Sequence, residues 1–144
     1  MDLDFDGAAA RGLRSYVRLV ASRLGLHGDC FYLDLHAPLN AYLALAHRLP
    51  MFPDRDLALI WDERHGWAAA LETDAGKTLL VVSHLGIEVL PPPEVVAQFV
   101  VDLVAGGFPL PPGDPPGLRA VDAKDDLPDR LAHYSRPALA EFVR

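Results

Sequence analysis

The chain has 144 residues, of which 51% are hydrophobic, and its formal net charge is −7 at pH 7. This length fits one domain of ordinary size, and the hydrophobic content excludes a chain that is disordered throughout. The acidic balance argues against broad contact with the phosphate backbone of nucleic acids. The single cysteine excludes a disulfide framework and any zinc or iron–sulfur site made of four cysteines.

No segment of the sequence predicts a secretory signal or a membrane anchor. Residues 1–6 are acidic, where a secretory signal would be basic and then apolar. No run of about eighteen apolar residues occurs, so we expect no transmembrane helix. The sequence therefore predicts a soluble protein of the reducing cytoplasm, and no motif in it indicates a cofactor.

The first predicted element is a helix at about 6–24. Asp6 is a suitable N-cap, and Gly25 stands where a left-handed C-cap is needed. Gly12 is an unfavourable residue in this helix, because glycine costs about 1 kcal/mol in a helix interior. One apolar face with helical spacing comprises Leu13, Tyr16, Val17, Val20 and Leu24.

The middle of the chain predicts an antiparallel meander of four or five strands. Short connections that end in Gly66 and Gly76 favour hairpins and exclude parallel crossovers. Trp61 and Trp67 flank the first of these turns, so we expect the two rings to pair across neighbouring strands. The expected strands are 31–35, 41–45, Leu57–Asp62, 67–73 and Thr78–His84.

Alternation along the last three strands separates a bulky face from a small one. The bulky face is the expected core side and comprises Leu57, Leu59, Trp61, Trp67, Ala69 and Leu71. The small face comprises Ala58, Ile60, Asp62, Ala68, Ala70 and Glu72. Small residues let another backbone approach closely, so this face could receive the C-terminal segment, a second subunit or a ligand.

The second half predicts a helix and then a proline-rich tail. Pro92 or Pro93 is expected to open this helix, since proline is tolerated in a first turn. Seven of the thirteen prolines lie in 107–144, so we expect an extended connector followed by short helices at 125–134 and 136–144. The organisation is an α+β domain at 1–106 and a tail at 107–144 that packs on the domain or on a partner. The apolar residues of the second helix cover about half of its circumference and comprise Val95, Val96, Phe99, Val100, Leu103 and Val104.

The densest group of ionisable residues lies on the turn after Trp61. Asp62, Glu63 and His65 could approach a metal ion or exchange protons, although a turn this polar is usually solvated. With Trp61 and Trp67 they make a candidate small-molecule site. No phosphate loop, catalytic motif or tight histidine–cysteine cluster accompanies them, so no catalytic residue and no metal ligand is assigned.

Two further features bear on binding. Arg11, Arg14 and Arg18 form a local basic patch on the first helix, which could contact an acidic partner or a phosphate group. A charged outer helix face is the simpler interpretation of this patch. Cys30 borders an apolar strand and is expected to be a buried, unreactive thiol.

Three segments together carry a family resemblance: GLRSYV at 12–17, PDRDLALIWDERHGW at 53–67 and VLPPPEVV at 89–96. They resemble an actinobacterial family of unknown function, DUF6292, over about residues 10–106. The resemblance implies an actinobacterial source and a cytoplasmic setting, but no activity and no catalytic residues. The order of elements is also similar to type III secretion chaperone-like and YbjN-like folds, which are small acidic α+β domains that commonly dimerise and bind polypeptides. Such an analogy does not determine function.

The leading hypothesis is a non-enzymatic binding or chaperone-like module that acts as a homodimer. The acidic charge, the small sheet face, the wide apolar stripe of the second helix and the missing catalytic motifs favour it. One alternative is a small-molecule-binding protein or enzyme with a site near the Trp61–Trp67 hairpin. Another is a regulatory partner of a nucleic-acid-binding protein. None of the three involves a membrane or direct contact with nucleic acid.

Overall fold

The computed structural model describes residues 7–26, 31–36, 38–45, 47–73, 78–106, 116–119 and 125–135. The strands form one antiparallel sheet in the order β1-β2-β3-β4-β5, so each strand pairs with its neighbour in sequence. The predicted α+β class with an antiparallel meander is confirmed. The elements are α1 (Ala8–Arg23), β1 (Phe31–Asp34), β2 (Asn40–Ala44), β3 (Leu57–Asp62), β4 (Gly66–Thr73), β5 (Thr78–His84), α2 (Pro93–Val104) and α3 (Leu127–Tyr134).

Local signals fix most of these boundaries. The bounds of β3 and β5 are those predicted, and Gly25 has the left-handed φ of +76° expected after α1. Pro92 caps α2, which begins at Pro93. Five predicted features lie wholly or mostly outside the described residues: Asp6, Cys30, the turn at Gly76, the extended connector after residue 106 and the helix at 136–144.

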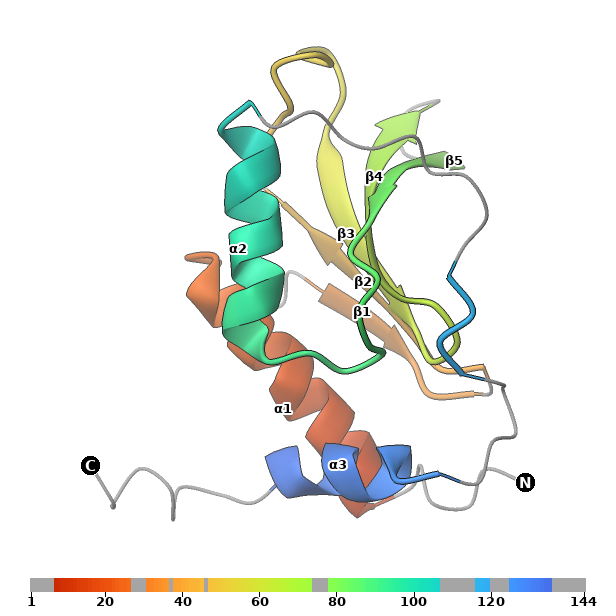
Figure 1. Ribbon diagram of the computed structural model, residues 1–144. Coiled ribbons are helices and arrows are strands. Elements are labelled where there is room, and N and C mark those ends of the chain that lie inside the picture. Colours follow the sequence, from red (N-terminus) through yellow and green to blue (C-terminus); the bar gives the residue numbers. More distant parts are fainter. Residues whose placement is uncertain are drawn as a thin grey trace.

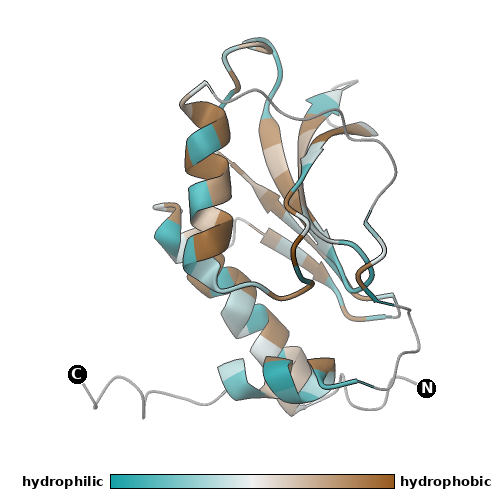
Figure 2. Ribbon diagram, in the orientation of Figure 1, coloured by the Kyte–Doolittle hydropathy of each residue, from teal (hydrophilic) through white to brown (hydrophobic). Residues whose placement is uncertain are grey.

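The helices α1 and α2 lie on the same face of the sheet, and α3 crosses α1 near its N-terminal end (Figure 1). The core lies between these two layers. All six residues of the predicted bulky face are at most 1% exposed, and they join the apolar faces of α1 and α2 in one cluster. Figure 2 shows α2 as a largely hydrophobic helix, in keeping with its predicted wide apolar stripe.

Tyr16 connects α1 to the sheet and to the segment before α2. Its hydroxyl donates to the carbonyl oxygen of Pro91 at 2.5 Å and accepts from Nε1 of Trp67 at 3.0 Å. Nε1 of Trp61 donates to the carbonyl oxygen of Val89 at 2.6 Å. Both indole N–H groups are therefore satisfied inside the core, and burial raises the pKa of Tyr16 far above its ordinary value.

Tyr16→Phe should destabilise the fold by about 2 kcal/mol, because it leaves the Trp67 indole N–H and the Pro91 carbonyl buried without partners. Urea unfolding followed by tryptophan fluorescence measures this loss. Tyr32→Phe is the matched control, since the Tyr32 side chain is 65% exposed. Equal urea midpoints for the two variants would contradict the role assigned to the Tyr16 hydroxyl.

Gly12 allows α3 to dock closely on α1. A Cβ at this position would lie 1.6 Å from the carbonyl oxygen of Leu131, so only glycine leaves room for the α3 backbone. Leu127 and Leu131 are 1% and 0% exposed in this contact, and the rings of Tyr16 and Tyr134 are 5.0 Å apart between centroids. The contact explains why a poor helix former stands inside α1.

Candidate functional site

The two tryptophans of the predicted turn site belong to the core. Trp61 and Trp67 are paired in register across β3 and β4, as predicted. They are 1% and 0% exposed, and their indole N–H groups bind partners inside the protein. Neither ring is presented at the surface, where a ligand would have to stack on it.

Glu63 is not solvated, and that interpretation of the turn is wrong for this residue. Its side chain is 1% exposed and accepts from Nη1 of Arg119, itself 3% exposed, at 2.5 Å. The other carboxylate oxygen accepts from the amide of Leu39 at 2.6 Å.

Arg119 also binds Asp125 at 2.8 Å and holds the pKa of that carboxyl below its usual value. The Leu118 amide adds a bond of 2.9 Å to the carbonyl oxygen of Arg64, so residues 116–119 are fixed to the turn.

Asp62 and His65 stabilise the hairpin between β3 and β4. One carboxylate oxygen of Asp62 accepts from the amides of Arg64 and His65, both at 2.8 Å. The other lies 3.0 Å from Nδ1 of His65, and Gly66 completes the turn with a φ of +71°. In the part of the chain that the structure describes, no group of three or more His, Cys, Asp or Glu side chains could hold a metal ion.

The predicted basic patch lies on the exposed side of α1. Arg11, Arg14 and Arg18 are all exposed, while Leu13 and Tyr16 between them face the core. Across the described ranges, no ion pair involves any of the three arginines. Their charges are available to solvent or to a partner.

The sheet face opposite α1 and α2, here called the outer face, has an apolar middle on β3 and β4 and a polar row of Asp34, Asn40 and Asp62 at one end. Its alanines Ala58, Ala68 and Ala70 are at most 4% exposed and lie outside the core cluster. The register aligns one residue from each strand into a row across the whole sheet. This outer row consists of Tyr32, Tyr42, Ile60, Ala68 and His84.

A hydrogen bond across the outer face shields its alanines. The Tyr42 hydroxyl on β2 donates to Oε2 of Glu72 on β4 at 2.5 Å, and the register places Ala58 of β3 beneath it. Burial, followed by the bond to Glu72, raises the pKa of Tyr42 to about 12. Because alanine is small, the tyrosine can extend over β3 to reach its acceptor.

His84 ends the outer row on the edge strand β5. Its Nδ1 is covered and has no hydrogen-bond partner within the described ranges. Burial lowers the pKa of His84, and the nearby His65 lowers it further, whereas Asp62 acts in the opposite direction. The imidazole is therefore neutral near pH 7 and has unused hydrogen-bonding capacity.

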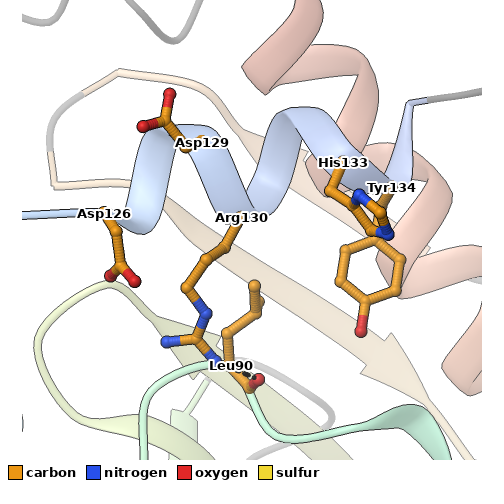
Figure 3. Close-up of a pocket in the computed structure, with 6 residues that line it drawn as sticks. All are labelled: Leu90, Asp126, Asp129, Arg130, His133 and Tyr134. Atoms are coloured by element: carbon orange, nitrogen blue, oxygen red, sulfur yellow. Dashed lines mark hydrogen bonds between the residues drawn. The ribbon is translucent and has the colours of Figure 1, made fainter.

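An open cavity of about 380 Å³ lies between α3 and Leu90 (Figure 3). Arg130 extends from α3 toward Leu90, donating to its carbonyl oxygen at 3.0 Å, and pairs with Glu88 at 2.5 Å. Asp126, Asp129, His133 and Tyr134 complete the lining. Since the guanidinium is already engaged by Glu88, this α3 cavity has no uncompensated cation to attract an anion.

The family comparison covers the helix–sheet part of the chain. A model for a family of unknown function, DUF6292, matches residues 16–102, more than half of the chain, in agreement with the resemblance in the sequence. The chain belongs to the DUF6292 family. No curated protein and no solved structure matches it.

The DUF6292 match includes the outer row, but Gly12, Arg119 and α3 lie outside it. None of the described helices is long and apolar enough to cross a membrane. DUF6292 is a family of unknown function, so membership indicates no activity for this chain. Its surfaces are the remaining guide to function. Sequence reasoning identified the small sheet face, but it missed Tyr32, Tyr42 and His84, which only the strand register aligns with it.

Proposed function

We propose that this DUF6292 protein is a non-enzymatic protein-binding module that acts as a homodimer through its outer face. The observation that carries the proposal is the apolar middle of β3 and β4 on both faces, where Ala58, Ile60, Ala68 and Ala70 lie on the outer side. Strands covered on one side alternate apolar and polar residues, whereas strands buried on both sides are apolar throughout. The described helices cover one side only (Figure 1), so a second layer is expected on the other.

The shape of the outer face favours a second copy of the chain as the layer that covers it. Tyr32 and Tyr42 make one half bulky, and Ala68 and Ala70 make the other half small. A two-fold axis running along β3 places the bulky half of each copy over the small half of the other. Two sheets packed in this way lie about 10 Å apart.

The same two-fold axis brings together the ends of the outer row. Tyr32 on β1 and His84 on β5 are equally far from β3 in one row, so each tyrosine faces the histidine of the other copy. A tyrosine hydroxyl can donate to a neutral imidazole. Because Nδ1 of His84 is covered within its own copy, such a bond would be made to Nε2.

The internal bonds of the turn support a role without catalysis. Asp62 is engaged by two backbone amides and by His65, and Glu63 is engaged by Arg119 and by the Leu39 amide. These carboxylates already serve the hairpin and the docking of residues 116–119. A general acid or base needs an oxygen within reach of a substrate, and neither carboxylate offers one that is unengaged.

The dimer is tested by measuring the molar mass with light scattering after size exclusion, at protein concentrations from micromolar to submillimolar. The wild-type chain should have the mass of two copies, and Tyr32→Lys should have the mass of one, because two lysines would then be buried at the contact. Leu19→Lys is the matched control, as Leu19 is 45% exposed on α1, away from the outer face. It should remain dimeric.

A wild-type chain that is monomeric throughout this concentration range would overturn the proposal. A dimer that dissociates equally in Tyr32→Lys and Leu19→Lys would place the contact elsewhere. Circular dichroism of both variants shows whether they fold, so a loss of mass is not confused with unfolding.

A further inference from the structure

A groove beside α2 has the lining of a polypeptide-binding site, on the helical side of the protein. It has a volume of about 360 Å³ and lies between α2 and Leu85, which follows β5. Leu85, Val95 and Phe99 form its apolar floor, and all three are half-buried. Because α2 residues four apart share one helix face, Glu94, Gln98 and Asp102 form a polar edge along the same groove.

The charge of this groove is wholly negative. Glu94 and Asp102 are its charged residues, and α2 contains no lysine or arginine. Across the described residues neither carboxylate forms an ion pair, although Asp102 accepts from Nε2 of Gln98 at 2.7 Å. The groove therefore combines an apolar floor with two carboxylates that lack a cation.

Asp102 is also unfavourably placed for the helix itself. It lies in the last turn of α2, where the helix dipole is negative and where no basic residue offsets it. An acidic residue at this end destabilises a helix, whereas a cation beside it is favourable. A cationic ligand would remove this unfavourable interaction. The helix end and the groove therefore both favour a positively charged ligand.

We propose that the α2 groove binds a basic polypeptide segment in extended conformation. Glu94 and Asp102 are eight residues apart, or about 12 Å along the helix axis. Alternate residues of an extended chain point to one side, and four residues of it span about 13 Å. The segment that fits has the pattern basic-x-apolar-x-basic, with the apolar side chain on Phe99 and Val95 and a cation at each carboxylate.

This site goes beyond the proposed dimer and does not depend on it. The groove is formed by α2, on the opposite side of the sheet from the outer face (Figure 1). A second copy bound at the outer face would leave the groove open. Its partner is a polypeptide that carries Lys or Arg around a large apolar residue.

Fluorescence anisotropy with synthetic peptides tests the groove on the full chain. The probe is a fluorescein-labelled peptide with the core Arg-Ser-Leu-Ser-Arg. It should bind saturably, and replacing its leucine by serine should weaken binding about tenfold, since the apolar floor then loses its contact. Replacing both arginines by glutamate should abolish binding. Higher salt should weaken the binding of the arginine peptide, because its ion pairs with the carboxylates are exposed to solvent.

Two substitutions that each remove one negative charge, on different helices, locate the binding site. Asp102→Asn keeps an acceptor for Gln98 and should weaken binding of the arginine peptide about threefold, because an exposed ion pair contributes little. Asp129→Asn removes one carboxylate from α3 and should leave binding unchanged. No saturable binding, or equal weakening by the two substitutions, would overturn the proposal. Tyr32→Lys should bind the peptide as well as wild type does, so this result is independent of the dimer.

Discussion

Arg119→Met is expected to destabilise the folded chain by about 3 kcal/mol. Glu63 would remain buried next to a side chain that can no longer neutralise it, and a buried unpaired charge is costly. The loss should appear as a lower urea midpoint. Arg48→Met is the matched control, because Arg48 and Asp56 are both more than half exposed and their pair should contribute less than about 1 kcal/mol.

A double variant separates the ion pair from the charge left behind. Glu63→Gln removes the charge but keeps a side-chain oxygen for the amide of Leu39. In the double variant with Arg119→Met, much of the stability lost by Arg119→Met alone should return. An Arg119→Met chain as stable as wild type would mean that this pair does not hold residues 116–119 to the turn.

Gly12→Ala should destabilise the protein by about 3 kcal/mol, although alanine is the better helix former. Helix propensity alone would stabilise α1 by about 1 kcal/mol. The added Cβ would lie 1.6 Å from the Leu131 carbonyl oxygen, so α3 would have to leave its place. Exposing Leu127 and Leu131 costs about 2 kcal/mol each. The packing loss therefore exceeds the gain in propensity.

Hydrogen exchange of the α3 amides, together with urea unfolding, measures this effect. Gly117→Ala is the control, because a Cβ there has no atom within 4 Å and should change little. If Gly12→Ala were more stable than wild type, propensity would dominate and α3 would not be docked on α1 in solution.

The helix–sheet part of the fold could be predicted because its signals are local. Alternation within each strand and a glycine at the end of the turn are enough to define the hairpin of β3 and β4. The same hairpin makes Trp61 and Trp67 cross-strand partners. Proline at the start of α2 and glycine after α1 fix helix ends in the same local way.

Glu63 and Gly12 could not be interpreted locally, because their partners lie far along the chain. A glutamate on a polar turn looks solvated until Arg119, 56 residues later, is placed against it. Gly12 looks like a defect in a helix until the α3 backbone lies on it. In both cases the deciding contact comes from the tail, whose sequence carries no signal of where it docks.

The outer face could be predicted from the sequence only in part, and the α2 groove could not be predicted from it. Period-two alternation identified Ile60 and the alanines of the outer face but not Tyr32, Tyr42 and His84, which lie in the same row. Tyr32 and His84 join that face through the register of the two edge strands, which depends on every pairing between them. The α2 groove needed the placement of Leu85 beside the helix, which is a tertiary contact.

The agreement between strand order and chain order has a consequence for synthesis on the ribosome. Each strand can pair with the preceding one as soon as it emerges, whereas Arg119 and α3 are made after the whole sheet. A nascent chain with a complete sheet still exposes the Gly12 surface of α1 and carries Glu63 without its cation. Sheet formation and tail docking are thus expected to be separate folding steps, and the incomplete chain presents a temporary docking surface to chaperones.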